Sequence, residues 1–107
     1  MAQTPERQVP AVATYVSLFR WTDQGVRNAK DTMKRHSAFR ADLERRSCKL
    51  VSIFWTQGEY DLVTTIEAPD AQTAMAALIA VARLGNVRTE TLPAFSEREM
   101  TSILEKV

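Results

Sequence analysis

The chain has 107 residues, of which 45% are apolar and 25% are charged, so it has enough apolar material for one folded domain and too much for a disordered chain. Its 14 basic and 13 acidic side chains leave a net charge of +1, which gives no electrostatic footprint for nucleic acid or for an anionic membrane. The single cysteine, Cys48, excludes a disulfide within the chain and gives no sign of secretion.

The first twelve residues, MAQTPERQVPAV, contain two prolines and lack the apolar stretch of a signal peptide. We interpret residues 1–12 as a disordered tail before a single domain over residues 13–107. No apolar stretch approaches the roughly 20 residues that a membrane-spanning helix needs, so we expect a cytoplasmic protein with no membrane partner.

The first half of the domain reads as a strand followed by an interrupted helix. Residues 13–21 are rich in β-branched and aromatic side chains, which predicts a strand. Residues 22–47 are polar with helical spacing, but one straight helix of that length would outrun the strand. Gly25 and a second capping signal at residues 31–32 predict a short first turn and a main helix from about Met33.

The second half reads as a hairpin, a helix, a strand and a last helix. Residues 48–58 and 60–68 predict two strands joined by a tight corner. The helix that follows is expected to start at the N-cap Asp70 and to end at Gly85. A fourth strand over residues 86–92 precedes a helix over residues 96–107, which opens with a capping box of Ser96 and Glu99.

This order, β-α-β-β-α-β with an extra C-terminal helix, predicts an α+β fold of the ferredoxin-like sandwich type. Right-handed crossovers place the strands in the spatial order 4-1-3-2, all antiparallel, with two helices on one face. The four strands then leave their other face without helices.

Both faces of the predicted sheet carry large apolar groups. Strict alternation puts Val51, Ile53 and Trp55 on one face of the second strand and Leu50 and Phe54 on the other. The nearly uncharged helix over residues 69–85 is likewise expected to be buried on more than one side. Because water should not wet both faces, we expect a homo-oligomer with facing sheets, as in a dimeric α/β-barrel. The alternative is that the terminal helix of the same chain covers the bare face.

Polar side chains from separate segments are predicted to meet at one edge of the sheet. The antiparallel order brings Glu59, Tyr60, Asp61 and Arg88 to the end of the first strand, next to Trp21. These groups form a candidate site for an anionic ligand. The alternative is structural: Arg88 pairs with Asp61, and Tyr60 covers the core with its hydroxyl in water.

Three stretches, YVSLFRWTDQGVRNAKDT, FWTQGEYDLVTTIEAPD and LGNVRTETLPAFSE, resemble the GYD-domain family of small bacterial and archaeal proteins. Gly58, Tyr60 and Asp61 correspond to the Gly-Tyr-Asp triplet of the family, although Glu59 stands between the first two. The resemblance covers residues 15 to about 99. It implies a ferredoxin-like or dimeric α/β-barrel fold and implies no activity.

His36 is the only histidine, and its spacing puts it on an apolar stripe with Met33, Phe39 and Leu43 that faces the sheet. A histidine in this position is either a hydrogen-bonded core residue or, in a cavity, a general base or ligand-orienting group. The two tryptophans, Trp21 and Trp55, have similar alternatives, since they line either a pocket or an interface.

The motifs of several other functions are missing from the sequence. There is no CxxC pair after the first strand, no Gly-rich phosphate loop and no metal-ligand spacing of Cys and His, so we expect no metal and no cofactor. The third strand lacks the aromatic residues with which RNA-binding domains of this fold stack bases.

We therefore expect an oligomeric small-ligand-binding or regulatory domain that takes an apolar or anionic molecule. Its expected ligand contacts are Trp21, His36, Trp55, Glu59, Tyr60, Asp61 and Arg88. One alternative is a cofactor-independent enzyme of the dimeric α/β-barrel type, an oxygenase or isomerase, with His36 and either Tyr60 or Asp61 in the pocket. Another is a purely structural assembly subunit.

Overall fold

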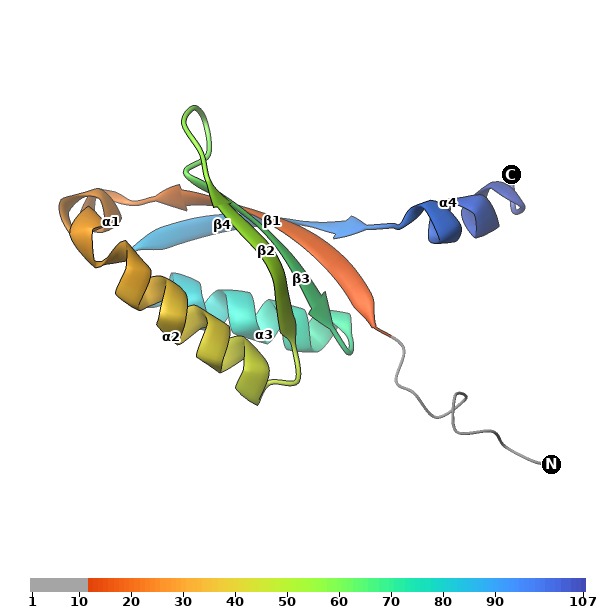
Figure 1. Cartoon of the computed structure of the whole chain (residues 1–107), viewed down its shortest axis with the longest axis horizontal. Helices are drawn as coiled ribbons and strands as arrows, with labels where there is room; N and C mark the ends of the chain where they lie inside the picture. Colours follow the sequence, from red (N-terminus) through yellow and green to blue (C-terminus); the bar gives the residue numbers. More distant parts are fainter. Residues whose placement is uncertain (1–11) are drawn as a thin grey trace.

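The computed structural model describes residues 12–107, which form a four-stranded antiparallel sheet with the helices α2 and α3 on one face (Figure 1). The strand order β2-β3-β1-β4 and the βαββαβ succession confirm the predicted ferredoxin-like fold. The elements are β1 (Ala13–Trp21), α1 (Asp23–Arg27), a 3-10 turn η2 (Ala29–Asp31), α2 (Thr32–Arg45), β2 (Lys49–Trp55), β3 (Leu62–Ala68), α3 (Ala71–Ala82), β4 (Val87–Ala94) and α4 (Glu97–Leu104). The predicted tail falls almost wholly outside the described residues.

The predicted interruption of the first helix is confirmed. The hydroxyl of Thr22 accepts the Gly25 N–H at 3.1 Å and starts the short α1, after which η2 turns the chain into α2. Asp31 stands at the N-cap of α2, but its side chain makes no capping hydrogen bond. The break therefore depends on α1 and η2 and not on the second capping signal.

The N-terminal signals of the later helices act as predicted, whereas α3 ends at Ala82, three residues before the expected Gly85. The Asp70 carboxylate accepts the backbone N–H of Thr73 at 2.7 Å, and this hydrogen bond lowers the pKa of Asp70. Ser96 and Glu99 form the reciprocal capping box at the start of α4. Gly85 follows α3 with a φ of 92°, a left-handed conformation that suits glycine.

The core lies between the sheet and the two long helices. Tyr15 and Phe19 on β1 pair with Ile66 and Leu62 on β3, and all four side chains point toward the helices and are buried. The rings of Phe19 and Phe39 meet edge to face with centroids 5.7 Å apart, which joins α2 to the central strand.

The predicted alternation on β2 is wrong at Leu50. A bulge at Val51 lies between the register pairs Leu50–Ile66 and Ser52–Thr65. Between these pairs β2 advances by two residues while β3 advances by one. Leu50 therefore turns under the helices, on the side of Ile53, and is only 5% exposed. Phe54 stays on the bare face with 67% of its surface exposed.

Two helical faces are more exposed than their patterns predict. Met33 is 57% exposed. Each step of three residues along a helix turns about 60° less than a full circle, so the two steps between Met33 and Phe39 place these side chains about 120° apart around α2. On α3, Ala77 is buried whereas Met75 and Ile79 remain more than half exposed. The expected burial of α3 on more than one side is thus not met within this chain.

The face of the sheet opposite the helices is bare within residues 12–107. Register pairs place Leu18, Val63 and Phe54 side by side across three strands of this face, with Val16 and Leu92 paired beside them. α4 does not cover this face, because it extends beyond the end of β4 (Figure 1). The alternative in which the chain covers its own sheet is therefore not the arrangement seen, and the homo-oligomer stays a prediction.

Gly25 makes a close backbone contact just beyond the end of β1, near the starts of β3 and β4. A Cβ on Gly25 would lie 2.1 Å from the carbonyl oxygen of Asn86, which accepts the Thr22 N–H. We expect Gly25→Ala to lower the free energy of unfolding by about 3 kcal/mol, because backbone on both sides resists movement. Chemical denaturation measures this change. The neighbouring Val26→Ala, at a residue 57% exposed, is the control and should change stability little; equal stability of both variants would contradict the close contact.

Candidate functional site

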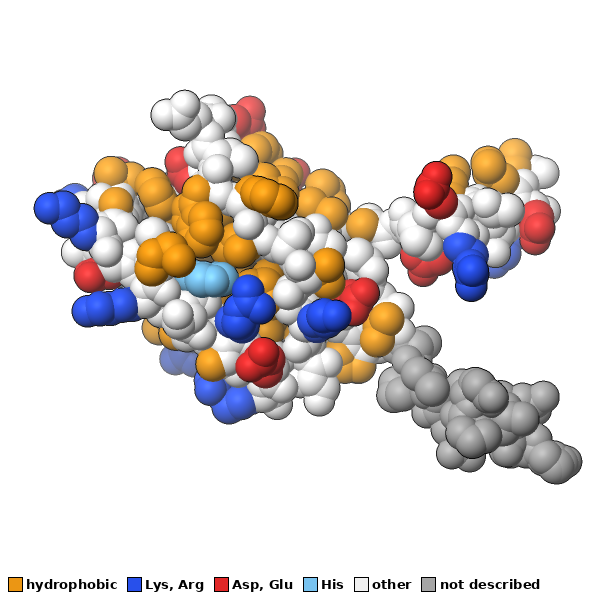
Figure 2. Space-filling model, in the orientation of Figure 1, with side chains coloured by type: hydrophobic (Ala, Val, Ile, Leu, Met, Phe, Trp, Pro, Cys, Tyr) orange, Lys and Arg blue, Asp and Glu red, His pale blue; other side chains and the backbone are white. Residues whose placement is uncertain are grey.

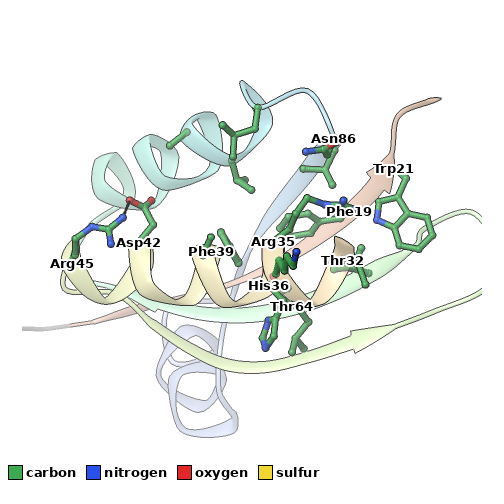
Figure 3. Close-up of a pocket in the computed structure, with 18 residues that line it drawn as sticks. Phe19, Trp21, Thr32, Arg35, His36, Phe39, Asp42, Arg45, Thr64 and Asn86 are labelled. Atoms are coloured by element: carbon green, nitrogen blue, oxygen red, sulfur yellow. Dashed lines mark hydrogen bonds and ion pairs between the residues drawn. The ribbon is translucent and has the colours of Figure 1, made fainter. Parts of the chain in front are cut away.

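A cleft of about 610 Å³ lies between α2, α3 and the helix-side face of the sheet (Figure 3). Most of its lining is apolar. Small side chains at Ala38 on α2 and Ala80 on α3 leave the space unfilled, while Phe19 and Leu62 form part of its floor. The complete lining is Phe19, Trp21, Thr32, Lys34, Arg35, His36, Ala38, Phe39, Asp42, Arg45, Ile53, Leu62, Thr64, Ala80, Val81, Leu84, Asn86 and Val87.

Two polar groups of α2 stand out in this apolar cleft. Arg35 donates through Nη1 to the Asn28 carbonyl at 2.7 Å, but its Nη2 is buried without a hydrogen-bond partner in residues 12–107. The Nδ1 atom of His36 is likewise buried and has no hydrogen-bond partner in residues 12–107. A buried polar atom left unpaired costs about 1–3 kcal/mol, and native proteins seldom leave one so. These two atoms are the polar groups of the cleft that stay unsatisfied within residues 12–107.

His36 sits at the mouth of the cleft and not in the core. In Figure 2 the only histidine of the sequence appears at the surface, flanked by apolar side chains. Its ring meets Trp55 edge to face with centroids 5.6 Å apart, and the Trp55 indole N–H donates to the Thr32 hydroxyl at 3.4 Å. Trp21 and His36, two of the predicted ligand contacts, line the cleft, and Trp55, which is not part of the lining, contacts His36 beside it.

At the end of the cleft away from Arg35, Asp42 forms ion pairs with two arginines of α2 and its C-cap. Figure 3 shows Asp42 and Arg45 there, joined by a hydrogen bond of 3.1 Å, with Arg35, Phe19 and Asn86 at the other end. Arg46 also donates to Asp42, at 2.8 Å, and this bond is the main cause of the lowered pKa of Asp42. Asp42 therefore has partners from both arginines, whereas Arg35 Nη2, at the other end, has none within residues 12–107.

The predicted gathering at the end of β1 is present, but it is separate from the cleft. The Arg20 guanidinium pairs with the Glu59 carboxylate and lies 4.5 Å from the centre of the Tyr60 ring. The Tyr60 hydroxyl donates to Glu90 at 2.9 Å. Arg88 is the register partner of Arg20 on β4. We call the group of Arg20, Glu59, Tyr60, Asp61, Arg88 and Glu90 the rim cluster.

The pairings within the rim cluster differ from the predicted ones. Asp61 does not form an ion pair with Arg88 within residues 12–107; its carboxylate accepts the backbone N–H of Trp21 at 2.8 Å. The Asp61 N–H in turn donates to the Phe19 carbonyl at 2.8 Å. Asp61 thus fastens the β2–β3 hairpin to the end of the central strand.

The Gly-Tyr-Asp residues therefore have structural partners in this chain. Gly58 turns the hairpin tip with a φ of 124°, Tyr60 holds Glu90 across the sheet, and Asp61 binds the backbone of β1. Glu59, Tyr60, Asp61 and Arg88 do not line the cleft, so the structure divides the predicted site residues into two groups. The pocket expected to contain His36 together with Tyr60 or Asp61 is not the cleft found here.

Sequence reasoning missed Arg35. Its only signal is its position beside His36, and neighbouring residues on a helix point about 100° apart. Nothing in the pattern shows that Arg35 reaches into the cleft. Within residues 12–107, no group of three or more His, Cys, Asp or Glu side chains is arranged to hold a metal ion, and none of the helices there is long and apolar enough to cross a bilayer.

The family is decided by a match to the model described as the GYD domain, which extends over residues 15–104. The chain belongs to the GYD domain family. Among curated proteins, this GYD protein is 30% identical over 93 residues to the "Glutamine synthetase and cystathionine beta-lyase binding protein" of Thermus thermophilus. The alignment covers 86% of the present chain and 98% of that relative.

Solved structures of similar fold include E. coli AsnC, with a TM-score of 0.55 and 14% identity, and an AsnC family transcriptional regulator from Agrobacterium tumefaciens, with a TM-score of 0.52 and 15% identity. The matches cover 91% of the GYD chain but only 59% and 58% of those two chains. At such low identity the likeness shows the fold alone.

The rim cluster predicts a measurable titration of Tyr60. Its hydrogen bond to the Glu90 carboxylate raises the pKa of Tyr60 above 10.0, so any stability from this bond is complete below the pKa of the unfolded chain and is lost as pH rises through the folded pKa. We expect Glu90→Ala to lower the pKa of Tyr60, as followed by NMR of the ring. Glu67→Ala, at the far end of β3, should leave it unchanged; the same pKa in wild type and Glu90→Ala would refute the bond.

Proposed function

We propose that this GYD protein is a binding module whose cleft between α2 and α3 holds a small molecule with an apolar body and one acidic group. The observation that carries the proposal is the pair of buried atoms Arg35 Nη2 and His36 Nδ1, which have no hydrogen-bond partner within residues 12–107, in a mostly apolar cleft. A carboxylate can accept from the guanidinium, and the apolar body would displace water from the walls.

The size of the cleft fits this role. Its volume of about 610 Å³ falls within the range of about 300–1,000 Å³ that is common for small-molecule sites. Such sites combine apolar walls with a few polar groups that fix the orientation of the ligand. Here Phe39, Ile53 and Val81 supply apolar wall, and Arg35 supplies charge.

The geometry favours binding over catalysis. A general base needs a partner that orients it and a reacting group within hydrogen-bond reach. His36 has no carboxylate or hydroxyl partner on its Nδ1 within residues 12–107, and its closest described ring contact is Trp55. The two other candidate catalytic groups, Tyr60 and Asp61, are held in the rim cluster.

A thermal-shift screen with matched compounds tests the proposed ligand class. We expect aliphatic and aromatic monocarboxylates to raise the melting temperature more than the corresponding amides, because a ligand that binds only the folded state stabilises it. Arg35→Met keeps the apolar stem and removes the charge, and we expect it to weaken carboxylate binding about 10- to 100-fold. Isothermal titration calorimetry measures the loss.

The matched control is Arg40→Met, at an exposed position of the same helix, which should bind as the wild type does. His36→Phe should weaken binding less than Arg35→Met, because it removes a hydrogen-bonding atom while keeping a ring beside Trp55. Equal binding by the wild type and Arg35→Met, or a preference for the amides, would contradict the acidic ligand.

A second candidate function, binding to another protein, is favoured by the name of the Thermus thermophilus relative. The exposed apolar residues Met75 and Ile79 on the outer side of α3 offer a surface for such contact. If this candidate is right, purified glutamine synthetase from the organism of this GYD protein should bind the wild type in biolayer interferometry. Met75→Glu/Ile79→Glu should bind the synthetase at least about 10-fold more weakly. Gln72→Glu, at a polar position of α3, is the control. No binding by the wild type would reject this partner.

A further inference from the structure

The end of the chain is an amphipathic helix with nothing beneath its apolar side. None of the α4 residues is buried, and Met100 and Leu104 are 45% and 58% exposed. Together with Ile103 they lie on one side of the helix, since their spacing of three and four residues follows the helical turn. Figure 1 shows α4 standing clear of the sheet and of the other helices.

This helix is too short to be stable without packing. It has eight residues, and isolated helices shorter than about 12–15 residues are marginal in water. The capping box of Ser96 and Glu99 satisfies N–H groups at its start, but a cap contributes only about 1 kcal/mol. The apolar side of α4 therefore calls for a surface to pack against.

The shape of the molecule shows that α4 is not packed on its own body. The described residues have a radius of gyration of 16.1 Å and a longest extent of 57 Å. A compact chain of this length would have a radius of about 13 Å. β4 is an edge strand, and α4 continues away from its end, so the arm points past its own sheet.

The bare face of the sheet is a second apolar surface without cover. Leu18, Val63 and Phe54 lie across its middle, and Leu92 of β4 is 44% exposed on the same face. Phe95, 61% exposed, stands between β4 and α4. The same chain thus carries an apolar helix and an apolar face that do not meet each other.

We propose that two copies of this chain exchange α4, so that the apolar side of each α4 packs against the bare sheet face of the other copy. A two-fold axis satisfies both surfaces of both chains at once, because each chain supplies one helix and one face. The net charge of +1 puts little repulsion between copies. This inference differs from the facing sheets expected from the sequence, because a helix of the other copy covers each bare face, and it is independent of any ligand in the cleft.

Sedimentation equilibrium with α4 variants tests the proposal. The wild type should have twice the chain mass of 12.1 kDa at micromolar concentration. Ile103→Glu/Leu104→Glu puts two charges on the apolar side of each α4, and we expect the dissociation constant of the pair to rise at least about 100-fold. The control, Thr101→Glu/Ser102→Glu, adds the same charge off the apolar side and should leave the pair intact.

The body of the domain should remain folded in both variants, because α4 contributes no buried residue; circular dichroism and thermal melting check this. A wild type that sediments as a single chain would overturn the pairing. Pairing of Ile103→Glu/Leu104→Glu with wild-type affinity would overturn the role of α4. Loss of ligand binding in a variant that still pairs would bear on the cleft alone.

Disulfide trapping distinguishes exchange from folding back onto the same sheet. A tagged chain carrying Leu104→Cys is mixed with an untagged chain carrying Phe54→Cys, and we expect a disulfide between the two under mild oxidation. Cys48 is 5% exposed and its burial raises the pKa of its thiol, so the parent chain is a suitable blank. Arg40→Cys, on the helix side, replaces Phe54→Cys as the control partner. A disulfide within one Phe54→Cys/Leu104→Cys chain at high dilution, without one between chains, would overturn the exchange.

Discussion

The pairing of β1 with both β3 and β4 is the constraint on which the rest of this structure depends. β1 is an inner strand, and its register with two antiparallel neighbours brings the starts of β3 and β4 to its own end at Trp21. The Asp61 carboxylate secures this junction by accepting the Trp21 N–H. On the other side of the junction, Gly25 admits the carbonyl of Asn86 where no Cβ would fit. Segments distant in sequence are thus fixed around one strand end.

The one-sided covering of this sheet gives the domain two apolar regions with different properties. On the helix side, large side chains such as Phe39 and Leu43 fill the core, but small residues where α2 faces α3 leave a cleft with Arg35 and His36 at one end. On the bare side no helix of residues 12–107 covers the sheet, and α4 extends away from it. The first region has the dimensions of a small-molecule site, and the second has the character of a protein interface.

The Gly-Tyr-Asp residues of this GYD protein are explained by architecture. Gly58 allows the hairpin tip to turn, Tyr60 bonds across the sheet to Glu90, and Asp61 binds the backbone of β1. The exposed Arg20–Glu59 pair contributes little stability by itself, since solvent screens it. In this chain these residues hold the β2–β3 hairpin beside β1, and Arg35 and His36 of the cleft come from α2.

The sequence by itself determined the succession of elements and the helix caps at Asp70 and Ser96, because these depend on local periodicity and capping chemistry. The strand order followed from that succession, because crossover connections are right-handed. It also brought Trp21, Tyr60 and Arg88 to one end of the sheet, since antiparallel order fixes which strand ends meet. Only the tertiary structure decided the rest. The bulge at Val51 turns Leu50 toward the helices. The helical angle between Met33 and Phe39 leaves Met33 exposed, and the space between α2 and α3 makes Arg35 part of the cleft lining. These outcomes depend on how whole elements pack, and no local pattern encodes the distance between two helices.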